Sequence, residues 1–244
     1  MKLDKIKQIV KDKYHNLASG EASCNCSCQS KKISESIGYT KDELANVGKA
    51  NMGLGCGNPV AISNISEGET VVDLGSGGGI DCILAAQKVG PQGKVIGIDF
   101  TQAMIDIALS NVKKTNHINI KFKLADIENL PLEDESVDKI ISNCVINLAP
   151  DKRAVFQEAR RVLKDTGKMY ISDIVLLEEL SKEQKSNKEL ISSCVAGALL
   201  KEDYINLIKE SGFKVNILNE NKAISKEQYN GINLESMALE IMKN

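Results

Sequence analysis

Apolar residues follow two different spacings along this chain. From Thr70 onward, short continuous apolar runs alternate with segments in which apolar residues recur every three or four positions. The runs are typical of buried strands, and the wider spacing is typical of amphipathic helices. Strands are expected at 70–74, 94–98, 120–125, 137–142 and 169–175, with helices beginning near Ile80, Gln102 and Asp151. This alternation predicts an α/β fold with a mostly parallel sheet and helices on both of its faces.

The two ends of the chain follow other patterns. The spacing of apolar residues predicts an amphipathic helix at 3–18 and a short helix at 41–50. The composition of 19–38, rich in Ser, Cys and Lys, predicts a loop. The last third predicts helices at 181–200 and 201–211, the second ended by Gly212, and two late strands at 215–218 and 237–242 that could pair antiparallel. We therefore divide the chain into an N-terminal helix with a cysteine-bearing loop (1–50), an α/β domain (51–175) and a C-terminal region that completes the sheet and a substrate pocket (176–244).

A glycine-rich loop connects the first strand of the α/β region to its first helix. Asp73 is followed by Gly75, Ser76, Gly77 and Gly79. A dinucleotide-binding fingerprint would place its third glycine at position 80, which is isoleucine here. The spacing instead resembles the Asp-x-Gly-x-Gly-x-Gly loop of S-adenosylmethionine (SAM) methyltransferases. The loop therefore predicts a nucleotide site at the carboxyl ends of the strands.

Acidic residues end the next two strands of the predicted sheet. Asp99 is placed to accept hydrogen bonds from both ribose hydroxyls, although it could instead cap the following helix, a role that Thr101 could also fill. In the methyltransferase family an acid at the position of Asp126 contacts the adenine amino group, and Asp73 lies near the methionine end. Phe100, Ile127 and Asn143 are the remaining cofactor contacts that we expect.

Composition excludes several classes of partner. The net charge is -2, aromatic residues are 4% and tryptophan is absent, so neither a nucleic acid nor an anionic membrane is expected. No apolar run is long enough for a membrane span, and the first residues lack a signal-peptide core, which predicts a cytoplasmic protein. Seven cysteines in a reducing compartment favour metal binding, catalysis or redox chemistry over disulfides. A monomer is favoured.

The thiols suggest a soft acceptor for a methyl group. Cys144 directly follows a predicted strand and should face the nucleotide crevice. The chain has two histidines, His15 and His117, and neither lies at a predicted strand end, so a general base for an oxygen, nitrogen or carbon nucleophile is not apparent. Trivalent arsenic needs no base, because it has a free lone pair and is selected by soft thiolate ligands.

Four motifs together resemble the arsenite SAM methyltransferases, a family with the Rossmann-like class I fold and a seven-stranded sheet. They are 51–59 (NMGLGCGNP), 73–81 (DLGSGGGID), 142–148 (SNCVINL) and 194–198 (CVAGA). The resemblance implies that SAM is the methyl donor and that Cys144 and Cys194 bind As(III), delivered as a thiol adduct. It implies a third thiolate from Cys24, Cys26 or Cys28, and a reductant such as thioredoxin or glutathione if turnover oxidises the thiols.

Each of these assignments has a structural alternative. Cys144 could be a small buried hydrophobe, and Cys194, on a predicted helix, could be a core residue. Cys82 is interpreted as core and Cys56 as structural, while the run from Cys24 to Cys28 could bind zinc despite its unusual spacing. For the chain as a whole, the alternatives are a SAM methyltransferase of a small organic acceptor and a cysteine-rich metal sensor that is not an enzyme.

Overall fold

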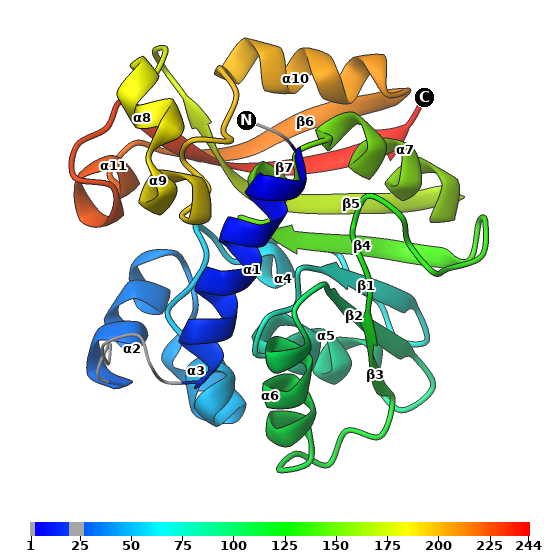
Figure 1. The fold of residues 1–244 in the computed structure, drawn as a ribbon. Coiled ribbons are helices and arrows are strands. Elements are labelled where there is room, and N and C mark those ends of the chain that lie inside the picture. Colours follow the sequence, from blue (N-terminus) through cyan, green and yellow to red (C-terminus); the bar gives the residue numbers. More distant parts are fainter. Residues whose placement is uncertain (1–2, 20–26) are drawn as a thin grey trace.

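The computed structural model describes residues 3–19 and 27–244, and its strands form one seven-stranded sheet in the order β3-β2-β1-β4-β5-β7-β6 (Figure 1). The strands are β1 (Thr70–Leu74), β2 (Lys94–Asp99), β3 (Ile120–Leu124), β4 (Val137–Asn143), β5 (Leu163–Leu176), β6 (Phe213–Asn221) and β7 (Leu234–Lys243). Strands β1 to β5 pair in parallel, and β7 lies antiparallel to both β5 and β6. This arrangement confirms the predicted fold and the antiparallel pairing of the two late strands.

Helices connect and cover these strands. They are α1 (Leu3–Ser19), α2 (Ser27–Ser36), α3 (Lys41–Val47), α4 (Pro59–Ile62), α5 (Ile80–Val89), α6 (Gln102–Val112), α7 (Lys152–Val162), α8 (Lys182–Ser186), α9 (Lys188–Ser192), α10 (Lys201–Glu210) and α11 (Ile224–Gln228), with 3-10 turns η1 (Gly48–Ala50) and η2 (Ile146–Leu148). None of the described helices is long and apolar enough to cross a membrane.

Three sequence predictions of local structure are wrong. The stretch 19–38, predicted as a loop, contains α2, which buries small polar residues such as Ser34 in place of an apolar stripe. The single helix predicted at 181–200 is two short helices, because Asn187 ends α8 and its side chain caps the first N–H groups of α9. A short helix, α11, lies between the last two strands, where none was expected.

The sheet separates two apolar layers, because alternate residues of a strand point to opposite faces. Val71 belongs to the layer that includes α5 and Val10 of α1, whereas Val72 belongs to the layer that includes α7 and α10. In the second layer the rings of Phe156 and Tyr204 meet edge to face, with centroids 6.0 Å apart. This contact attaches α10, from the C-terminal region, to α7 of the preceding α/β segment.

Helix α1 crosses the front of the molecule in Figure 1 and packs against α6 and α9. It therefore lies over the end of the sheet at which β1, β2 and β4 finish. In a parallel sheet that end receives the ligand, so α1 covers the region in which a site is expected.

The Phe156–Tyr204 contact can be tested by its effect on stability. Phe156→Ala removes a fully buried ring, and we expect it to lower the free energy of unfolding by about 3–5 kcal/mol. Ile118→Ala is the control: that side chain is 92% exposed, so the change should stay within about 0.5 kcal/mol. Urea denaturation measures both values. Equal effects in the two variants would contradict the assigned packing.

Candidate functional site

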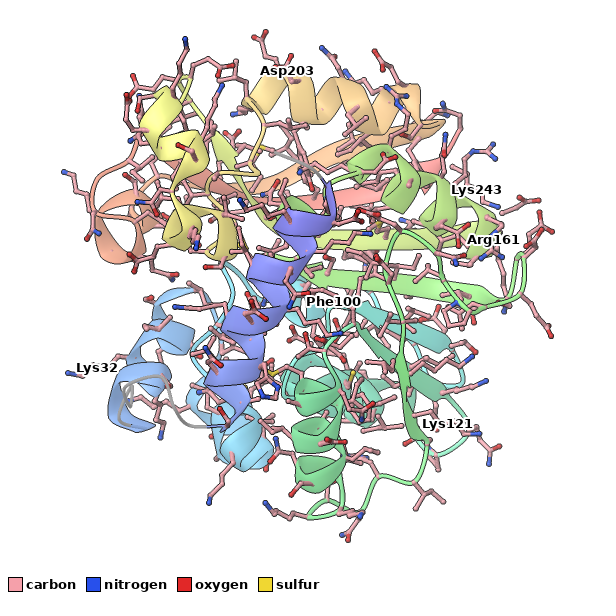
Figure 2. The ribbon with its side chains drawn as sticks, viewed as in Figure 1. Lys32, Phe100, Lys121, Arg161, Asp203 and Lys243 are labelled. Carbon is pink, nitrogen blue, oxygen red and sulfur yellow. The ribbon has the colours of Figure 1, made fainter. Side chains whose placement is uncertain are left out.

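A cavity of about 470 Å³ opens where β1, β2 and β4 end, beneath α1. Its walls come from the glycine loop, from the first residues after β2, β3 and β4, and from Lys7 and Tyr14 of α1. Phe100, which lines it, lies near the centre of the molecule in Figure 2. The cavity thus brings together segments from across the chain.

The glycine loop leaves room for a ligand that a side chain would fill. Gly75 has a φ of +70°, and a Cβ there would stand 2.3 Å from Cγ2 of Val145. Gly77 has a φ of +49°, and a Cβ there would meet nothing within 4 Å, because it would project into the cavity. Next to it, the buried hydroxyl of Ser76 has no hydrogen-bond partner among the described residues. The loop therefore suits a cofactor with polar groups that approaches the backbone closely.

Asp99 is held rigidly at the end of β2. Its Oδ2 accepts from the N–H of Gly77 at 3.0 Å and its Oδ1 accepts from the N–H of Thr101 at 2.8 Å. Burial raises the pKa of Asp99, while these backbone N–H groups oppose the shift. A carboxylate fixed at the cavity wall is suited to accept hydrogen bonds from a ribose, so this role stays a prediction for Asp99.

A second set of polar groups surrounds the expected methionine end. Asp73 and Asp81 both line the cavity, and burial raises the pKa of Asp81 to about 6 although Tyr39 and Asn143 hydrogen-bond to it. The amide of Asn143 donates to Tyr39 Oη at 3.0 Å and to the Gly57 carbonyl at 2.8 Å, and its oxygen accepts from the N–H of Cys56 at 3.0 Å. This one side chain fixes the loop that carries Cys56 against the end of β4.

Helix α1 closes the expected adenine end through a charge pair. Lys7 Nζ lies 2.6 Å from Asp126 Oδ2 and also pairs with Glu128. The other oxygen of Asp126 accepts from the N–H of Glu128 at 3.0 Å. The acid predicted to contact adenine is thus at the cavity wall, with a cation from α1 beside it.

Two thiols lie at the opposite wall in an uncommon backbone conformation. Cys144 follows β4 with a φ of +57°, and Cys194 follows α9 with a φ of +71°. Both are buried and both line the cavity. The prediction that Cys194 lies on a helix is wrong, because it lies in the turn after α9. A non-glycine residue in this left-handed backbone conformation costs about 1–2 kcal/mol of folding free energy, and such residues cluster at functional sites.

Cys56 and Asp173 lie behind Cys144. The sulfur atoms of Cys56 and Cys144 and a carboxylate oxygen of Asp173 all lie within 4.8 Å of one another. Asp173 is fully buried and accepts from Asn147 Nδ2 at 2.8 Å and from Tyr204 Oη at 3.0 Å. Cys56, expected to be structural, is therefore a neighbour of Cys144, and the sequence offered no signal beyond its place in a glycine loop.

The three thiols do not titrate alike. The neighbouring thiols of Cys194 and Cys56 hold the pKa of Cys144 well below its usual range, against the effect of burial. The neighbouring Cys144 and burial raise the pKa of Cys194, and burial and the neighbouring Cys144 raise the pKa of Cys56. The thiols of Cys194 and Cys56 donate to backbone carbonyls, Cys194 to that of Cys144 at 2.6 Å and Cys56 to that of Ser172 at 3.3 Å. Cys144 is therefore the thiol of this cluster most disposed to ionise, and a thiolate is a nucleophile for a thiophilic centre.

The structure brings most of the predicted site residues to this cavity. Gly79 does not line it and instead precedes α5, while Gly78 lines it. Cys82 is buried outside the cavity and donates to Asp73 Oδ2 at 3.3 Å, in keeping with its interpretation as core. Cys24, Cys26 and the side chain of Cys28 lie outside the described part of the chain. The predicted residues that line the cavity are Asp73, Gly75, Ser76, Gly77, Asp99, Phe100, Asp126, Ile127, Asn143, Cys144 and Cys194.

Three polar side chains that line the cavity were not predicted from the sequence. Tyr14 of α1, Gln228 at the end of α11 and Tyr229 just after it all line the cavity. Tyr229 Oη lies 3.9 Å from Cys144 Sγ. Nothing in the local sequence marks these residues, because only the tertiary fold brings their segments to the cavity.

Comparison with known proteins places the chain among methyltransferases. Residues 65–212 match the family described as Methyltransferase domain. The arsenite methyltransferase of Halobacterium salinarum is 41% identical over 227 residues, which are 86% of this chain and 58% of that protein. The mouse arsenite methyltransferase is 34% identical, with coverages of 86% and 58%. The chain therefore spans less than two thirds of the length of these relatives.

A solved structure agrees. The arsenic(III) S-adenosylmethionine methyltransferase of Chlamydomonas reinhardtii superposes with a TM-score of 0.68 at 33% identity, covering 86% of this chain and 73% of that one.

The left-handed backbone at Cys144 predicts an unusual order of stabilities. Glycine adopts this conformation without steric cost. We therefore expect the free energy of unfolding of Cys144→Gly to be about 1 kcal/mol higher than that of Cys144→Ala. At Cys82, inside α5, the order should reverse, because glycine is the weaker helix former. Urea denaturation of the four variants measures this. The same order at both positions would contradict the assigned conformation.

The lowered pKa of Cys144 predicts selective alkylation. We expect iodoacetamide to modify Cys144 at pH values below the usual thiol range, because its pKa is lowered. Removing a neighbouring thiol in Cys56→Ala or Cys194→Ala should move the reaction of Cys144 to higher pH, since these neighbours lower its pKa. Mass spectrometry of the alkylated peptides follows each thiol. A pH profile of Cys144 that both variants leave unchanged would be evidence against the cluster.

Proposed function

Because the chain belongs to the methyltransferase-domain family and, within it, to the arsenite methyltransferases, we propose that it transfers the methyl group of SAM to trivalent arsenic. The observation that carries the proposal is the thiolate cluster at one wall of the cavity whose other walls suit SAM. Cys144 and Cys194 line that cavity and Cys56 lies directly behind Cys144. Methylation of arsenite in this way would serve arsenic detoxification.

The residues around the glycine loop would hold the cofactor. Asp99 would accept from the ribose, Asp126 from the adenine amino group, and Asp73 would lie near the methionine end. When bound, SAM supplies an electrophilic methyl on a sulfonium, which the arsenic lone pair can take by in-line displacement. The chain's part is to fix the two reactants in line and to exclude water, and α1 is placed for the second task.

We assign the arsenic clamp to Cys56, Cys144 and Cys194. Cys144 is the thiolate that begins ligand exchange, because its pKa is lowered. Each exchange forms one S–As bond and breaks one As–O bond. The first, made by the Cys144 thiolate, releases hydroxide to solvent, and in the next two the departing hydroxide takes the proton of the attacking thiol and leaves as water. Cys194 and Cys56 hold the protons that the second and third exchanges consume. With a thiol adduct as donor, the leaving group would be a free thiol.

The clamp needs no general base. Three thiolates leave arsenic with one lone pair, and that lone pair is already unprotonated. This agrees with the described cavity wall, to which neither His15 nor His117 contributes. The placement of Cys56 beside Cys144 favours it as the third ligand over Cys24, Cys26 and Cys28, which remain candidates for delivering arsenic to the clamp.

The thiols also define the surroundings that the reaction requires. The clamp works only while its cysteines are reduced, so we propose a reducing compartment, the cytoplasm. If turnover oxidises the thiols, thioredoxin or glutathione would restore them by thiol–disulfide exchange.

Substitution of single thiols tests the proposal. Labelled SAM and arsenite are incubated with a thiol reductant and the intact chain, Cys144→Ser, Cys194→Ser or Cys56→Ser. We expect methylarsenic product from the intact chain and a loss of about 100-fold or more in each variant, because serine does not replace a soft ligand. The triple variant of Cys24, Cys26 and Cys28 should slow the reaction less than Cys56→Ser does.

Cys82→Ser is the matched control, because Cys82 lies outside the cavity and a serine hydroxyl can still donate to Asp73. We expect it to keep most of the activity. Normal SAM binding without any arsenic product from the intact chain would overturn the proposal and favour an organic acceptor.

A further inference from the structure

The arsenic site has a second set of donors that the thiolate clamp does not use. Gln228 and Tyr229 are adjacent in sequence, and both line the cavity. Nε2 of Gln228 is buried and has no hydrogen-bond partner among the described residues. Tyr229 Oη lies 3.9 Å from Cys144 Sγ. Both donors therefore reach the cavity from the C-terminal region, outside the part of the chain that carries the glycine loop.

A buried amide N–H without an acceptor costs free energy that a ligand can recover. The cost of leaving it free is about 1–3 kcal/mol, so such a group is retained where it meets an acceptor during function. Gln228 lines the cavity, so a molecule bound there, substrate or cofactor, is placed to supply the acceptor.

Tyr229 becomes free when the substrate binds. In the contact between Tyr229 Oη and Cys144 Sγ either atom can be the donor. Once the sulfur forms a bond to arsenic, it is a weaker acceptor, and the phenol can turn to an atom attached to arsenic. The atom attached to arsenic at that stage is an oxygen that has not yet been exchanged.

We propose that Gln228 and Tyr229 form an oxygen subsite, which holds the hydroxyl ligands of arsenite while the thiolates displace them. This inference rests on the proposed function of the thiol cluster. In each exchange the As–O bond breaks and the sulfur takes the place of the oxygen on arsenic. The oxygen displaced by the Cys144 thiolate departs as hydroxide, and those displaced by Cys194 and Cys56 combine with the thiol protons to form water. The two donors stabilise negative charge on the departing oxygen, so they accelerate thiolate exchange without forming a bond to arsenic. They are positioning residues for the leaving group.

The test compares two arsenic compounds that differ in their leaving groups. The leaving group of arsenite departs through an oxygen atom. The leaving group of arsenic triglutathione, which excess glutathione keeps intact, departs through a sulfur atom. The variants are Gln228→Met and Tyr229→Phe, which keep the side-chain size and remove the donor. The readout is the rate at which Cys144 becomes protected from iodoacetamide, measured without SAM by mass spectrometry. Methyl transfer and the KM for SAM are measured separately.

We expect each variant to slow protection by arsenite about 10-fold, the effect of one hydrogen bond to a charged group. Protection by arsenic triglutathione should change less than about 3-fold, and the KM for SAM should stay unchanged. Gln102→Met and Tyr170→Phe are matched controls outside the cavity, where Gln102 donates to Asp106 and Tyr170 to Glu240. Both should behave as the intact chain.

Three results would overturn the subsite. An equal loss with both arsenic compounds would indicate a structural role, a raised KM for SAM would indicate a cofactor contact, and unchanged rates would show that the donors are idle. Failure of the proposed function would give a different result. Arsenite would protect Cys144 of the intact chain from iodoacetamide, and yet the chain would release no methylarsenic product. If arsenite does not protect Cys144 of the intact chain at all, both proposals are wrong.

Discussion

The parallel pairing of β4 between β1 and β5 is the constraint on which the site depends. Val72 of β1 pairs with Ile140, and Asn143 of β4 pairs with Ser172 of β5. Parallel strands end at the same edge of the sheet, so this register places the glycine loop after β1 beside Cys144 after β4. Asp173, the residue after Ser172, is brought behind the same thiol. A shift of one residue would turn each of these side chains to the other face.

Close packing at this edge transmits the constraint to the loops. The missing side chain of Gly75 leaves room for Val145, which follows Cys144 directly. Asn143 joins β4 to the loop of Cys56 and to Tyr39, which in turn bonds to Asp81 at 2.7 Å. The glycine-loop wall and the thiol wall of the cavity are thus connected through one amide. A displacement of side chains at one wall is transmitted to the other, because the closely packed interior leaves no free space to accommodate it.

The C-terminal region does more than complete the sheet. Its strand β7 pairs with β5 along nine registered positions, from Lys168 with Met242 to Leu176 with Leu234. Since α11 immediately precedes β7, this pairing fixes where Gln228 and Tyr229 enter the cavity. Cys194 reaches the same place from α9, and α1 packs against that helix. Segments that are remote in sequence therefore complete a site begun by the glycine loop.

The sequence by itself determined the class of fold, the edge of the sheet at which the cavity opens, and most residues of the glycine-loop wall of that cavity. These features are local: an apolar run predicts a strand, a glycine loop after it predicts a ligand, and an acid at the next strand end faces the same crevice. Cys144 could be predicted for the same reason. The short helices α2 and α11 escaped prediction, because they have no regular apolar stripe.

Only the tertiary structure decided how the thiols cooperate. Cys56, Cys144 and Cys194 come from three distant segments, and their spacing in the chain does not reveal that two of these thiols lower the pKa of the third. The same holds for Tyr14, Gln228 and Tyr229, whose chemistry depends on which side chain lies opposite. Shifted pKa values and unmet hydrogen bonds are properties of contacts between segments, and such contacts exist only after the chain has folded.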